Sequence, residues 1–311
     1  MSMITVVGSL NMDLVITAPK MPVMGETILG SGFMTTPGGK GANQAVAAAR
    51  LGGCVTMVGC VGNDIFGKDI LKNLELNNVK TNLINIVEGV STGIAVIVIE
   101  NGNNAIIVDP GANSLLSSQI VENNENTIKS SNILMVQLEI PLETVEKTVE
   151  IAKRAGVNVL LNPAPARRLS DELLRKVDIF TPNETECEII TGLSINSVAE
   201  AKEALRFLLN KGIGQVVITM GDKGVVYNRG IELVHKPVNK VKVVDTTAAG
   251  DSFSGALAVS LSQGNSIDEA VDFGNIVGAL TVTRKGAQAS LPTIDEVNNY
   301  MKLREMQGGC N

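Results

Sequence analysis

The sequence predicts an α/β protein built on an open, mostly parallel twisted sheet with helices on both faces. Short apolar segments alternate with segments of helical periodicity along the chain. The apolar segments are continuous rather than alternating, which is typical of strands buried on both faces of a parallel sheet. With 311 residues, 44% of them hydrophobic, the chain is long enough for one large core and a small appendage.

The expected strands and helices follow one another in βα order, which is the pattern of a parallel sheet. Pro141 suits a first helical turn, and Gly156 and Gly212 suit positions just after a helix. The expected strands are 4–7, 54–58, 133–137, 157–161, 179–180 and 216–220, and the expected helices are 42–50, 66–77, 142–155, 198–210, 251–262 and 267–282.

Two stretches depart from this alternation. The first, 14–35, contains several turn residues and no helical pattern. The second, 93–108, has two apolar segments around an Asn-Gly-Asn-Asn turn at 101–104, which predicts a hairpin. We therefore expect a small β-sheet lid, formed by about 14–37 and 93–108. It should project from a single domain that spans 1–311, since no linker or repeat divides the chain.

The composition excludes several classes of function. The formal net charge of −6 argues against non-specific nucleic-acid binding, which needs a basic surface. Trp is absent and aromatic residues make up 3%, so platforms for stacked bases are not expected. No apolar run is long enough to span a bilayer, and residues 1–8 lack the basic start of a signal peptide. We expect no membrane association and a cytoplasmic location.

The cysteines and the one histidine do not form a recognisable reactive or metal site. Cys54, Cys60, Cys187 and Cys310 show no Cys-x-x-Cys pairing, so buried thiols are expected. His235 stands alone in a short alternating stretch and is expected to be a solvated strand residue. Mechanisms that need a Ser-His-Asp or Cys-His set are therefore disfavoured.

The most informative segment is 244–256, Val-Asp-Thr-Thr-Ala-Ala-Gly-Asp-Ser-Phe-Ser-Gly-Ala. We expect a β-branched strand end at 241–244, followed by a helix that opens at 249–251. Small side chains let a ligand approach the backbone, and the first N–H groups of a helix have no internal partner, so this turn predicts an anion site. Asp251 at its mouth is either a catalytic carboxylate or an acid favoured by the helix dipole.

A second motif lies far upstream, at 37–45, Pro-Gly-Gly-Lys-Gly-Ala-Asn-Gln-Ala. Three glycines around a lysine suit a turn against a ligand better than a core. Gly-Asn-Asp-Ile-Phe-Gly follows at 62–67. Together the segments resemble the two signature sequences of the ribokinase (PfkB) family of carbohydrate kinases, and the resemblance extends from Asn11 to Ser290.

The resemblance implies a fold and a reaction. The fold would be ribokinase-like, with the small β-sheet as a lid that also forms a homodimer interface. The reaction would be ATP-dependent phosphorylation of D-ribose at the 5-hydroxyl, giving D-ribose 5-phosphate and ADP. Asp251 would act as general base, and the backbone at Ala248, Ala249 and Gly250 would hold the transferring phosphoryl group.

The resemblance also carries over the contacts to a sugar substrate. Amide and carboxylate side chains suit a sugar because one side chain can bridge neighbouring hydroxyls. Taken singly, each residue has an ordinary alternative as a turn former, a solvated charge or a helix-start acid, but an expected place at strand ends favours a ligand site. The implied sugar contacts are Asn11, Asp13, Gly39, Lys40, Asn43, Glu139 and Asp251.

For the nucleotide, the resemblance implies contacts from four parts of the chain. The Asn-x-x-Glu spacing at 183–186 equally predicts a capping box at the start of a helix. The Thr-Met-Gly-Asp-Lys-Gly segment at 219–224 equally predicts a hairpin turn. The implied residues are Asn183, Thr219, Gly221, Gly224, Gly250 and Asn275 for ATP, with Glu186 acting on Mg²⁺ through water.

A potassium site is a further implication. Oxygen ligands from two loops suit a weakly hydrated monovalent cation, and no histidine or thiol competes nearby. The expected cofactors are therefore ATP, Mg²⁺ and K⁺. The implied K⁺ ligands are Asp245, Thr247 and Ser290, with the carbonyl groups of Thr281, Arg284 and Gly286.

Three alternatives stay in view. A sibling kinase acting on 2-deoxyribose, fructose or a nucleoside would use the same motifs. A non-catalytic sugar-sensing protein on this fold would be expected to lack Asp251 or Gly250, and both are present. A dehydrogenase or a P-loop kinase is disfavoured, because neither Gly-x-Gly-x-x-Gly nor Gly-x-x-x-x-Gly-Lys-Ser/Thr occurs.

Overall fold

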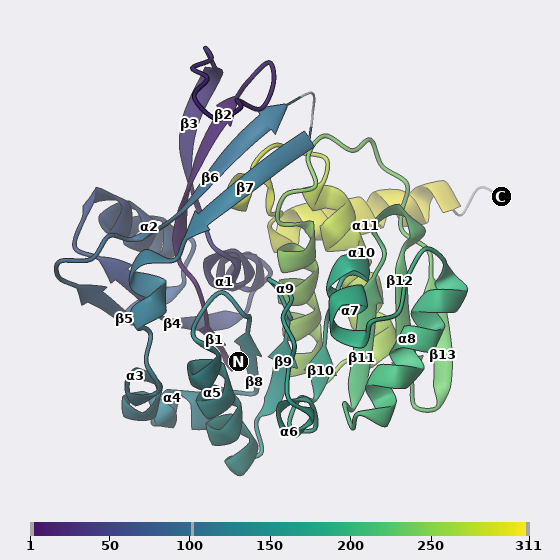
Figure 1. Ribbon diagram of the computed structural model, residues 1–311. Coiled ribbons are helices and arrows are strands. Elements are labelled where there is room, and N and C mark those ends of the chain that lie inside the picture. The colour runs from purple at the N-terminus through teal and green to yellow at the C-terminus, as the bar shows by residue number, and fades with distance from the viewer. Residues whose placement is uncertain (1–2, 101–102, 309–311) are drawn as a thin grey trace.

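The computed structural model describes residues 3–100 and 103–308, which form a large and a small sheet (Figure 1). The large sheet has nine strands in the order β13-β12-β11-β10-β9-β8-β1-β4-β5. Neighbours from β11 to β5 run parallel, while β12 and β13 add an antiparallel edge, so the predicted mostly parallel sheet is confirmed. The bounds are β1 Met3–Val7, β4 Cys54–Gly62, β5 Lys80–Val87, β8 Ile133–Val136, β9 Asn158–Leu161, β10 Ile179–Phe180, β11 Gln215–Thr219, β12 Val225–Arg229 and β13 Glu232–Lys236.

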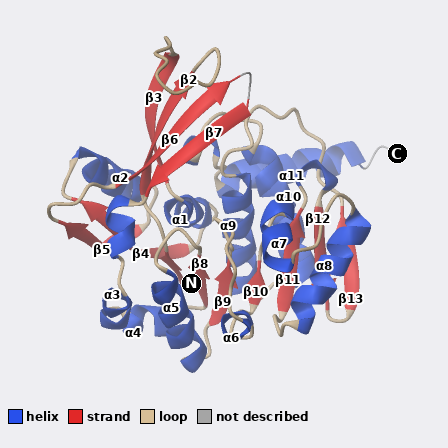
Figure 2. Cartoon of the chain, viewed as in Figure 1, coloured by secondary structure: helices blue, strands red, loops and turns tan. Residues whose placement is uncertain are grey.

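Helices cover both faces of the large sheet (Figure 2). Successive strand residues point to opposite faces, so Val6 joins the hydrophobic cluster under α1, α2, α9, α10 and α11, and Val7 joins the cluster under α3 to α8. This two-sided burial explains the continuous apolar strands. The helices are α1 Lys40–Arg50, α2 Ile65–Leu76, α3 Ser118–Asn123, α4 Glu125–Lys129, α5 Leu142–Arg154, α6 Asp171–Leu174, α7 Glu184–Thr191, α8 Val198–Asn210, α9 Ala249–Ser262, α10 Ile267–Thr281 and α11 Ile294–Gly308, with short 3₁₀ turns η1 Gly111–Leu115, η2 Gly221–Lys223 and η3 Gln288–Ser290.

The small sheet has four strands in the order β3-β2-β6-β7 and projects from the body of the molecule (Figure 1). Its bounds are β2 Asn11–Thr17, β3 Ser31–Gly38, β6 Gly93–Glu100 and β7 Asn103–Asp109. Residues 101 and 102 of the expected hairpin turn lie outside the described residues. In the part of the chain that is described, every helix is too short or too polar to cross a bilayer.

The expected strand end at 241–244 is wrong. Residues 237–248 contain no strand, and the side chains of Val243 and Val244 are 58% and 47% exposed. β13 already forms the edge of the large sheet, and the N–H groups of Val244 and Asp245 both donate to the single carbonyl oxygen of Val282. The segment is therefore fastened to the end of α10 instead of a strand, and β-branched side chains alone misled the interpretation.

The thiols are buried at two of the four cysteines. Burial raises the pKa of Cys60 to about 11 and is the main cause that raises the pKa of Cys187 to about 12. Cys54 is half-buried, and Cys310 lies outside the described residues. The two buried thiols stay protonated at neutral pH and serve as small core side chains.

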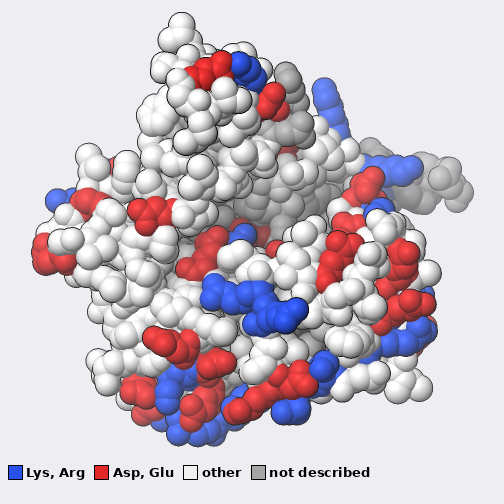
Figure 3. Space-filling view, in the orientation of Figure 1, with Lys and Arg blue, Asp and Glu red and all other residues white. Residues whose placement is uncertain are grey.

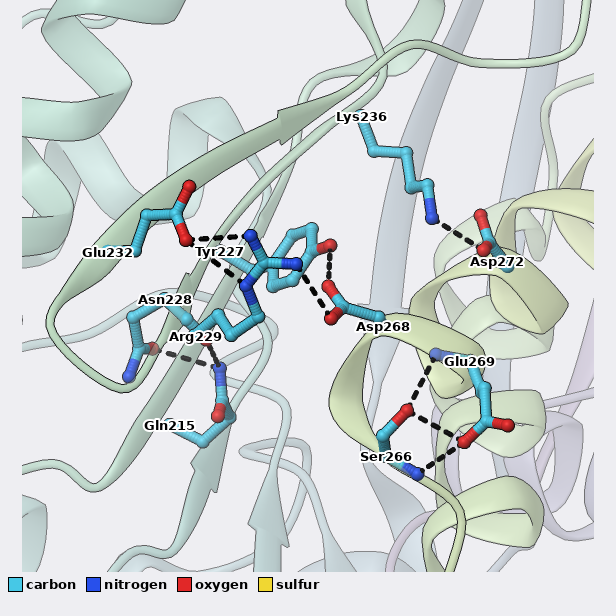
Figure 4. Close-up of polar contacts among 10 residues, drawn as sticks. All are labelled: Gln215, Tyr227, Asn228, Arg229, Glu232, Lys236, Ser266, Asp268, Glu269 and Asp272. Atoms are coloured by element: carbon cyan, nitrogen blue, oxygen red, sulfur yellow. Dashed lines mark hydrogen bonds and ion pairs between the residues drawn. The ribbon is translucent and has the colours of Figure 1, made fainter.

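Polar contacts tie α10 to the antiparallel edge of the large sheet (Figure 4). The hydroxyl of Tyr227 donates to the carboxylate of Asp268 at the start of α10, and Arg229 pairs with the other oxygen of that carboxylate at 3.0 Å. One helical turn further on, Lys236 pairs with Asp272 at 2.5 Å. These contacts hold the helix that carries Asn275 against β12 and β13.

Helices α1 and α9 pack closely at Gly255. A β-carbon there would lie 2.8 Å from Cβ of Ala47 and 3.2 Å from the carbonyl oxygen of Gln44, so a side chain at this position would push the helices apart. The close packing brings Asn43 and Gln44 on α1 beside Asp251 on α9. The glycine thus sets the distance between the two sequence motifs.

Candidate active site

The candidate site lies at the carboxyl ends of the parallel strands, where open α/β sheets bind ligands. A cavity of about 150 Å³ opens there. Figure 3 shows the surface hollowed between the small sheet and the body of the molecule, with acidic and basic atoms at the floor. Larger cavities of about 250 and 360 Å³ contain none of the predicted site residues. The predicted site residues that line the 150 Å³ cavity are Lys40, Asn183, Glu186, Thr219, Ala248, Ala249, Gly250 and Asp251.

The start of α9 forms an exposed backbone turn in this cavity. Ala248 adopts a left-handed conformation with φ 60°, which is strained for a residue with a β-carbon and is often found at functional sites. The N–H of Ala249 donates to the carbonyl oxygen of Thr246, but no partner for the N–H groups of Gly250 and Asp251 is found among the described residues. These two donors and the helix dipole can receive an anion.

Two glycines of the motifs have different reasons to be glycine. Gly39 has φ 87°, and a β-carbon there would lie 2.7 Å from the backbone nitrogen of Asn11, so the turn itself requires glycine. A β-carbon at Gly250 would meet no protein atom within 4 Å. Since Gly250 lines the cavity, the space beside it is room for a ligand.

Asp251 is held by two amides of α1. It lies in the first turn of α9 and is 8% exposed. Its Oδ2 accepts a hydrogen bond from Asn43 Nδ2 at 2.9 Å, and its Oδ1 accepts one from Gln44 Nε2 at 3.1 Å. The two bonds fix the orientation of the carboxylate and leave a lone-pair site on each oxygen for a further hydrogen-bond donor.

Four acidic side chains lie near Lys40: Asp251, Glu139, Glu186 and Asp13. Burial, and then the charges of Glu139 and Asp251, raise the pKa of Asp13 to about 7, while Lys40 opposes the rise. Burial acts to lower the pKa of Lys40, but the nearby carboxylates outweigh it and raise the pKa above its usual value. Glu139 also accepts hydrogen bonds from the backbone N–H of Lys40 at 3.2 Å and from Ser9 Oγ at 2.5 Å. The cluster therefore offers several charged acceptors and one cation to a polyhydroxyl ligand.

The amide of Asn11 is oriented by a residue that the sequence analysis missed. Asn113 follows β7, and its Nδ2 donates to Oδ1 of Asn11 at 2.7 Å. Asn113 is itself fixed by two hydrogen bonds with the backbone of Leu10. Because Oδ1 of Asn11 is occupied, its NH₂ group is the part left to donate to a ligand.

The predicted capping box at 183–186 is present. Oδ1 of Asn183 accepts from the N–H of Glu186 at 2.8 Å, and Oε2 of Glu186 accepts from the N–H of Asn183 at 2.9 Å. Both residues also line the cavity, so the cap does not remove them from the site. Burial, assisted by the charge of Asp251, raises the pKa of Glu186 above its usual value.

The segment 219–224 joins the antiparallel strands β11 and β12 through η2, as the hairpin alternative predicts. A β-carbon at Gly224 would lie 2.2 Å from the carbonyl oxygen of Lys236, so the turn requires this glycine. His235 supports the same turn, with Nε2 2.7 Å from the carbonyl oxygen of Lys223, and is a half-buried residue of β13. Asn275 is buried in α10 outside the lining of the cavity.

The proposed potassium ligands lie on two loops that Asp245 joins. Oδ1 of Asp245 accepts from the N–H and the hydroxyl of Thr247 at 2.9 and 2.6 Å, and Oδ2 accepts from the N–H of Gly286 at 2.8 Å. Burial acts to raise the pKa of Asp245, but these hydrogen bonds outweigh it and lower the pKa. The hydroxyl of Ser290 donates to the carbonyl oxygen of Ala287 at 2.7 Å.

This donor set fits a monovalent cation. The hydroxyls of Thr247 and Ser290 use their hydrogens within the protein, which leaves their oxygen lone pairs for a cation. Asp245 supplies one negative charge, and the other donors are neutral oxygens, which suits a singly charged ion. Within the described residues no group of three His, Cys, Asp or Glu side chains could hold a metal ion. Thr281 and Arg284 border this region, with the N–H of Arg284 donating to the carbonyl oxygen of Thr281 at 3.2 Å.

The chain belongs to the pfkB family of carbohydrate kinases, whose model matches residues 1–294. This confirms the family indicated by the two motifs. A ribokinase of Haemophilus influenzae is 45% identical over 301 residues, covering 96% of this chain and 98% of its own length. A deoxyribokinase of Salmonella typhi is 40% identical over 304 residues, covering 97% and 99%. The structure of Arabidopsis thaliana ribokinase complexed with ribose and ATP matches with a TM-score of 0.90 at 32% identity, covering 96% and 98%.

Proposed function

We propose that this chain is a ribokinase, which transfers the γ-phosphoryl group of ATP to the 5-hydroxyl of D-ribose and releases D-ribose 5-phosphate and ADP. The proposal depends mainly on the position of Asp251, whose buried carboxylate is fixed by two amides beside the open backbone turn at Gly250. Full-length similarity to ribokinases supports the choice of sugar and nucleotide.

In this reaction Asp251 accepts the proton of the sugar hydroxyl. The hydroxyl oxygen forms a bond to the γ-phosphorus as the bond from phosphorus to the β,γ-bridging oxygen breaks, and ADP leaves. The N–H groups of Gly250 and Asp251 stabilise the charge on the transferring group. A general base of this kind contributes about 10²–10⁴-fold to the rate.

The sugar is held by the polar residues around Lys40. Asn11 donates from its NH₂ group, whose orientation Asn113 determines. Asp13 and Glu139 accept from hydroxyl groups, and the backbone at Gly39 approaches the sugar closely. Asn43 contributes the amide hydrogen that Asp251 does not use.

The nucleotide lies on the other side of Asp251. Asn183 and Thr219 line the shared cavity and face the phosphates, and the turn at Gly221 and Gly224 follows β11 at the same sheet edge. Asn275 in α10 contacts the base. Glu186 would hold Mg²⁺, and the bound ion would neutralise phosphate charge.

A potassium ion is held by Asp245, Thr247 and Ser290 with the carbonyl groups of Thr281, Arg284 and Gly286. When bound, it supplies positive charge that stiffens the loop leading into the turn at Ala248 and α9. Asp245 already ties that loop to the loop of Gly286, so the protein prepares the arrangement that the ion completes.

The small sheet serves as the lid and as the interface of a homodimer. It carries exposed apolar side chains at Phe33 and Ile107, which are 66% and 72% exposed. Exposed apolar groups gathered on one projecting sheet favour association. The formal net charge of −6 disfavours contact with nucleic acid, and a cytoplasmic enzyme without membrane association remains our expectation.

Phosphorylation of 2-deoxyribose is the second candidate, because a deoxyribokinase is 40% identical over almost the whole chain. The deciding experiment measures ADP release from MgATP with D-ribose, 2-deoxyribose, fructose and adenosine in parallel, beside an Asp251→Asn variant. Turnover with D-ribose that the variant loses supports the proposal. A higher kcat/KM with another acceptor would identify that acceptor as the substrate and leave the proposed mechanism unchanged. Sugar binding without turnover would indicate a sensor.

A further inference from the structure

Asp251 receives its two hydrogen bonds from two separate series of amide side chains. In the first series, Asn73 Nδ2 donates to Gln288 Oε1 at 2.5 Å, and Gln288 Nε2 donates to Asn43 Oδ1 at 3.1 Å. Asn43 Nδ2 then donates to Oδ2 of Asp251 at 2.9 Å. The series connects α2, η3, α1 and α9, and both Asn43 and Gln288 are buried.

The second series approaches from the large sheet. Gln137, just after β8, donates from Nε2 to Gln44 Oε1 at 2.6 Å. Gln44 donates from Nε2 to Oδ1 of Asp251 and to Oδ1 of Asn162, each at 3.1 Å. Gln44 and Gln137 are fully buried, and Oε1 of Gln137 has no hydrogen-bond partner among the described residues.

The carboxylate at the end of each series determines which way every amide points. An ionised carboxylate can only accept, so Asn43 and Gln44 must turn their NH₂ groups toward Asp251. Their carbonyl oxygens then face away from it and need donors. Gln288 and Gln137 must therefore present NH₂ groups in turn, and each series is polarised toward the carboxylate.

The unpartnered oxygen of Gln137 argues that this polarity serves a function. Leaving a buried acceptor unpaired costs free energy. The oxygen lies against Gly8, where a β-carbon would lie 2.0 Å from it, so only glycine leaves room for the oxygen. The amide is explained if its N–H is needed to hold Gln44.

We infer that Gln44 and Gln288 are positioning residues for the base, Gln44 directly and Gln288 through Asn43. The inference rests on the proposed role of Asp251 in phosphoryl transfer. Each carboxylate oxygen has two lone-pair sites, so one amide per oxygen leaves a site for the sugar hydroxyl. With both oxygens held, the carboxylate cannot rotate away from the hydroxyl whose proton it accepts.

The first test is a double-mutant cycle on Gln44 and Gln137. Gln44→Met and Gln137→Met should each lower kcat about 10- to 100-fold, while the sugar Kd measured by titration calorimetry stays within about threefold. Because Gln137 acts through Gln44, the double variant should have the kcat of Gln44→Met alone. Gln137→Met removes one unpaired oxygen but leaves Oε1 of Gln44 without its donor, so its midpoint of urea unfolding should stay close to that of the wild type.

The second test separates the donor N–H of Gln288 from its size. Gln288→Glu keeps the shape and Gln288→Met keeps the volume, and neither offers an amide donor to Asn43. Both should lower kcat by about 10-fold or more. Asn228→Leu is the matched control, because Asn228 is an equally buried amide on β12 that accepts from the N–H of Val216. It should lower stability and leave kcat within about twofold.

The outcomes distinguish this inference from the proposed function. Lower kcat in the single variants with no added loss in the double variant supports it. The inference would be overturned if kcat were unchanged in Gln44→Met and Gln288→Met. It would also be overturned if the decreases in kcat of the single variants added up in the double variant and followed the loss of stability. If Asp251→Asn itself retained turnover, the base would be misassigned, and the proposed mechanism and this inference would fall together.

Discussion

Asn43 donates a hydrogen bond from Nδ2 to Oδ2 of Asp251 at 2.9 Å, although the two residues are 208 positions apart in the chain. Each belongs to one of the two sequence motifs, and the contact exists because α1 and α9 pack closely at Gly255. The motifs are thus two halves of one site. A change that separates these helices should act on catalysis before it acts on the rest of the fold.

We predict that Gly250→Ala loses activity while the protein stays folded. An added β-carbon would meet no protein atom and would project into the cavity beside Asp251, where the transferring phosphoryl group is proposed to lie. Alanine also favours the helix by about 0.5–1 kcal/mol over glycine. The β-carbon should displace the phosphoryl group from the N–H donors, so turnover should fall at least about 100-fold, with an unchanged or higher Tm.

Gly278→Ala is the control for that experiment. A β-carbon at Gly278 in α10 also has room, with its nearest neighbour the carbonyl oxygen of Ala249 at 3.9 Å. It should show the same gain in Tm and keep full activity. Equal activity in both variants would contradict the placement of the phosphoryl group beside Gly250.

The protonation of Asp13 predicts a pH-dependent stability of the ligand-free protein. Its pKa of about 7 in the folded state is raised above the usual 3.8, so between these values the folded state holds a proton that the unfolded state has lost. Stability contributed by this site is therefore full below about pH 4 and falls as pH rises toward 7. The cost at neutral pH is roughly 2–4 kcal/mol.

Urea unfolding of the wild type and Asp13→Asn from pH 4.5 to 8 measures this effect. The free energy of unfolding of Asp13→Asn should increase relative to that of the wild type as pH rises to about 7. Above pH 7 the difference should stay constant. Asp69→Asn, a change at an exposed site in α2, is the control and should track the wild type throughout. A difference between wild type and Asp13→Asn that does not vary with pH would contradict the raised pKa.

The fold was predictable where one local signal decided the structure. Continuous apolar runs identified β1, β4 and β9 because both faces of the sheet are covered. The same reasoning failed at 241–244, where β-branched residues form a loop whose N–H group at Val244 donates to the carbonyl oxygen of Val282 at the end of α10. Burial on two faces, rather than β-branching, is the signal that held.

The site was predictable only where motifs marked it. Asn113, Gln44 and Gln288 were missed because a single amide has no spacing or periodicity that distinguishes it in a sequence. Their importance arises when packing brings them to Asn11 and Asp251. The Asn-Gln pair in the first motif was the one available signal, since both residues lie in a helix of small side chains where long polar groups need partners.

The contact between Tyr227 and Asp268 should stabilise the fold without affecting catalysis. Burial and this hydrogen bond raise the pKa of the Tyr227 hydroxyl above its usual value, so it remains a donor at all working pH values. Tyr227→Phe should lower the free energy of unfolding by about 1–2 kcal/mol and leave kcat unchanged. Tyr300→Phe, at the other tyrosine of the chain, is the control and should change neither. A lower kcat in Tyr227→Phe would instead link this edge to the site.

The potassium site predicts a stabilisation that depends on Asp245. An ion bound only by the folded state raises its stability by about 1.4 kcal/mol at ten times its Kd, so Tm of the wild type should be higher in K⁺ than in tetramethylammonium at equal ionic strength. Asp245→Asn removes the one negative charge of the donor set and should abolish this difference, whatever its own baseline Tm. Asp295→Asn in α11 is the control and should keep the difference. If Tm and activity of the wild type were the same in the two salts, the loops joined by Asp245 would be structural only, because hydrogen bonds from Thr247 and Gly286 already hold them together.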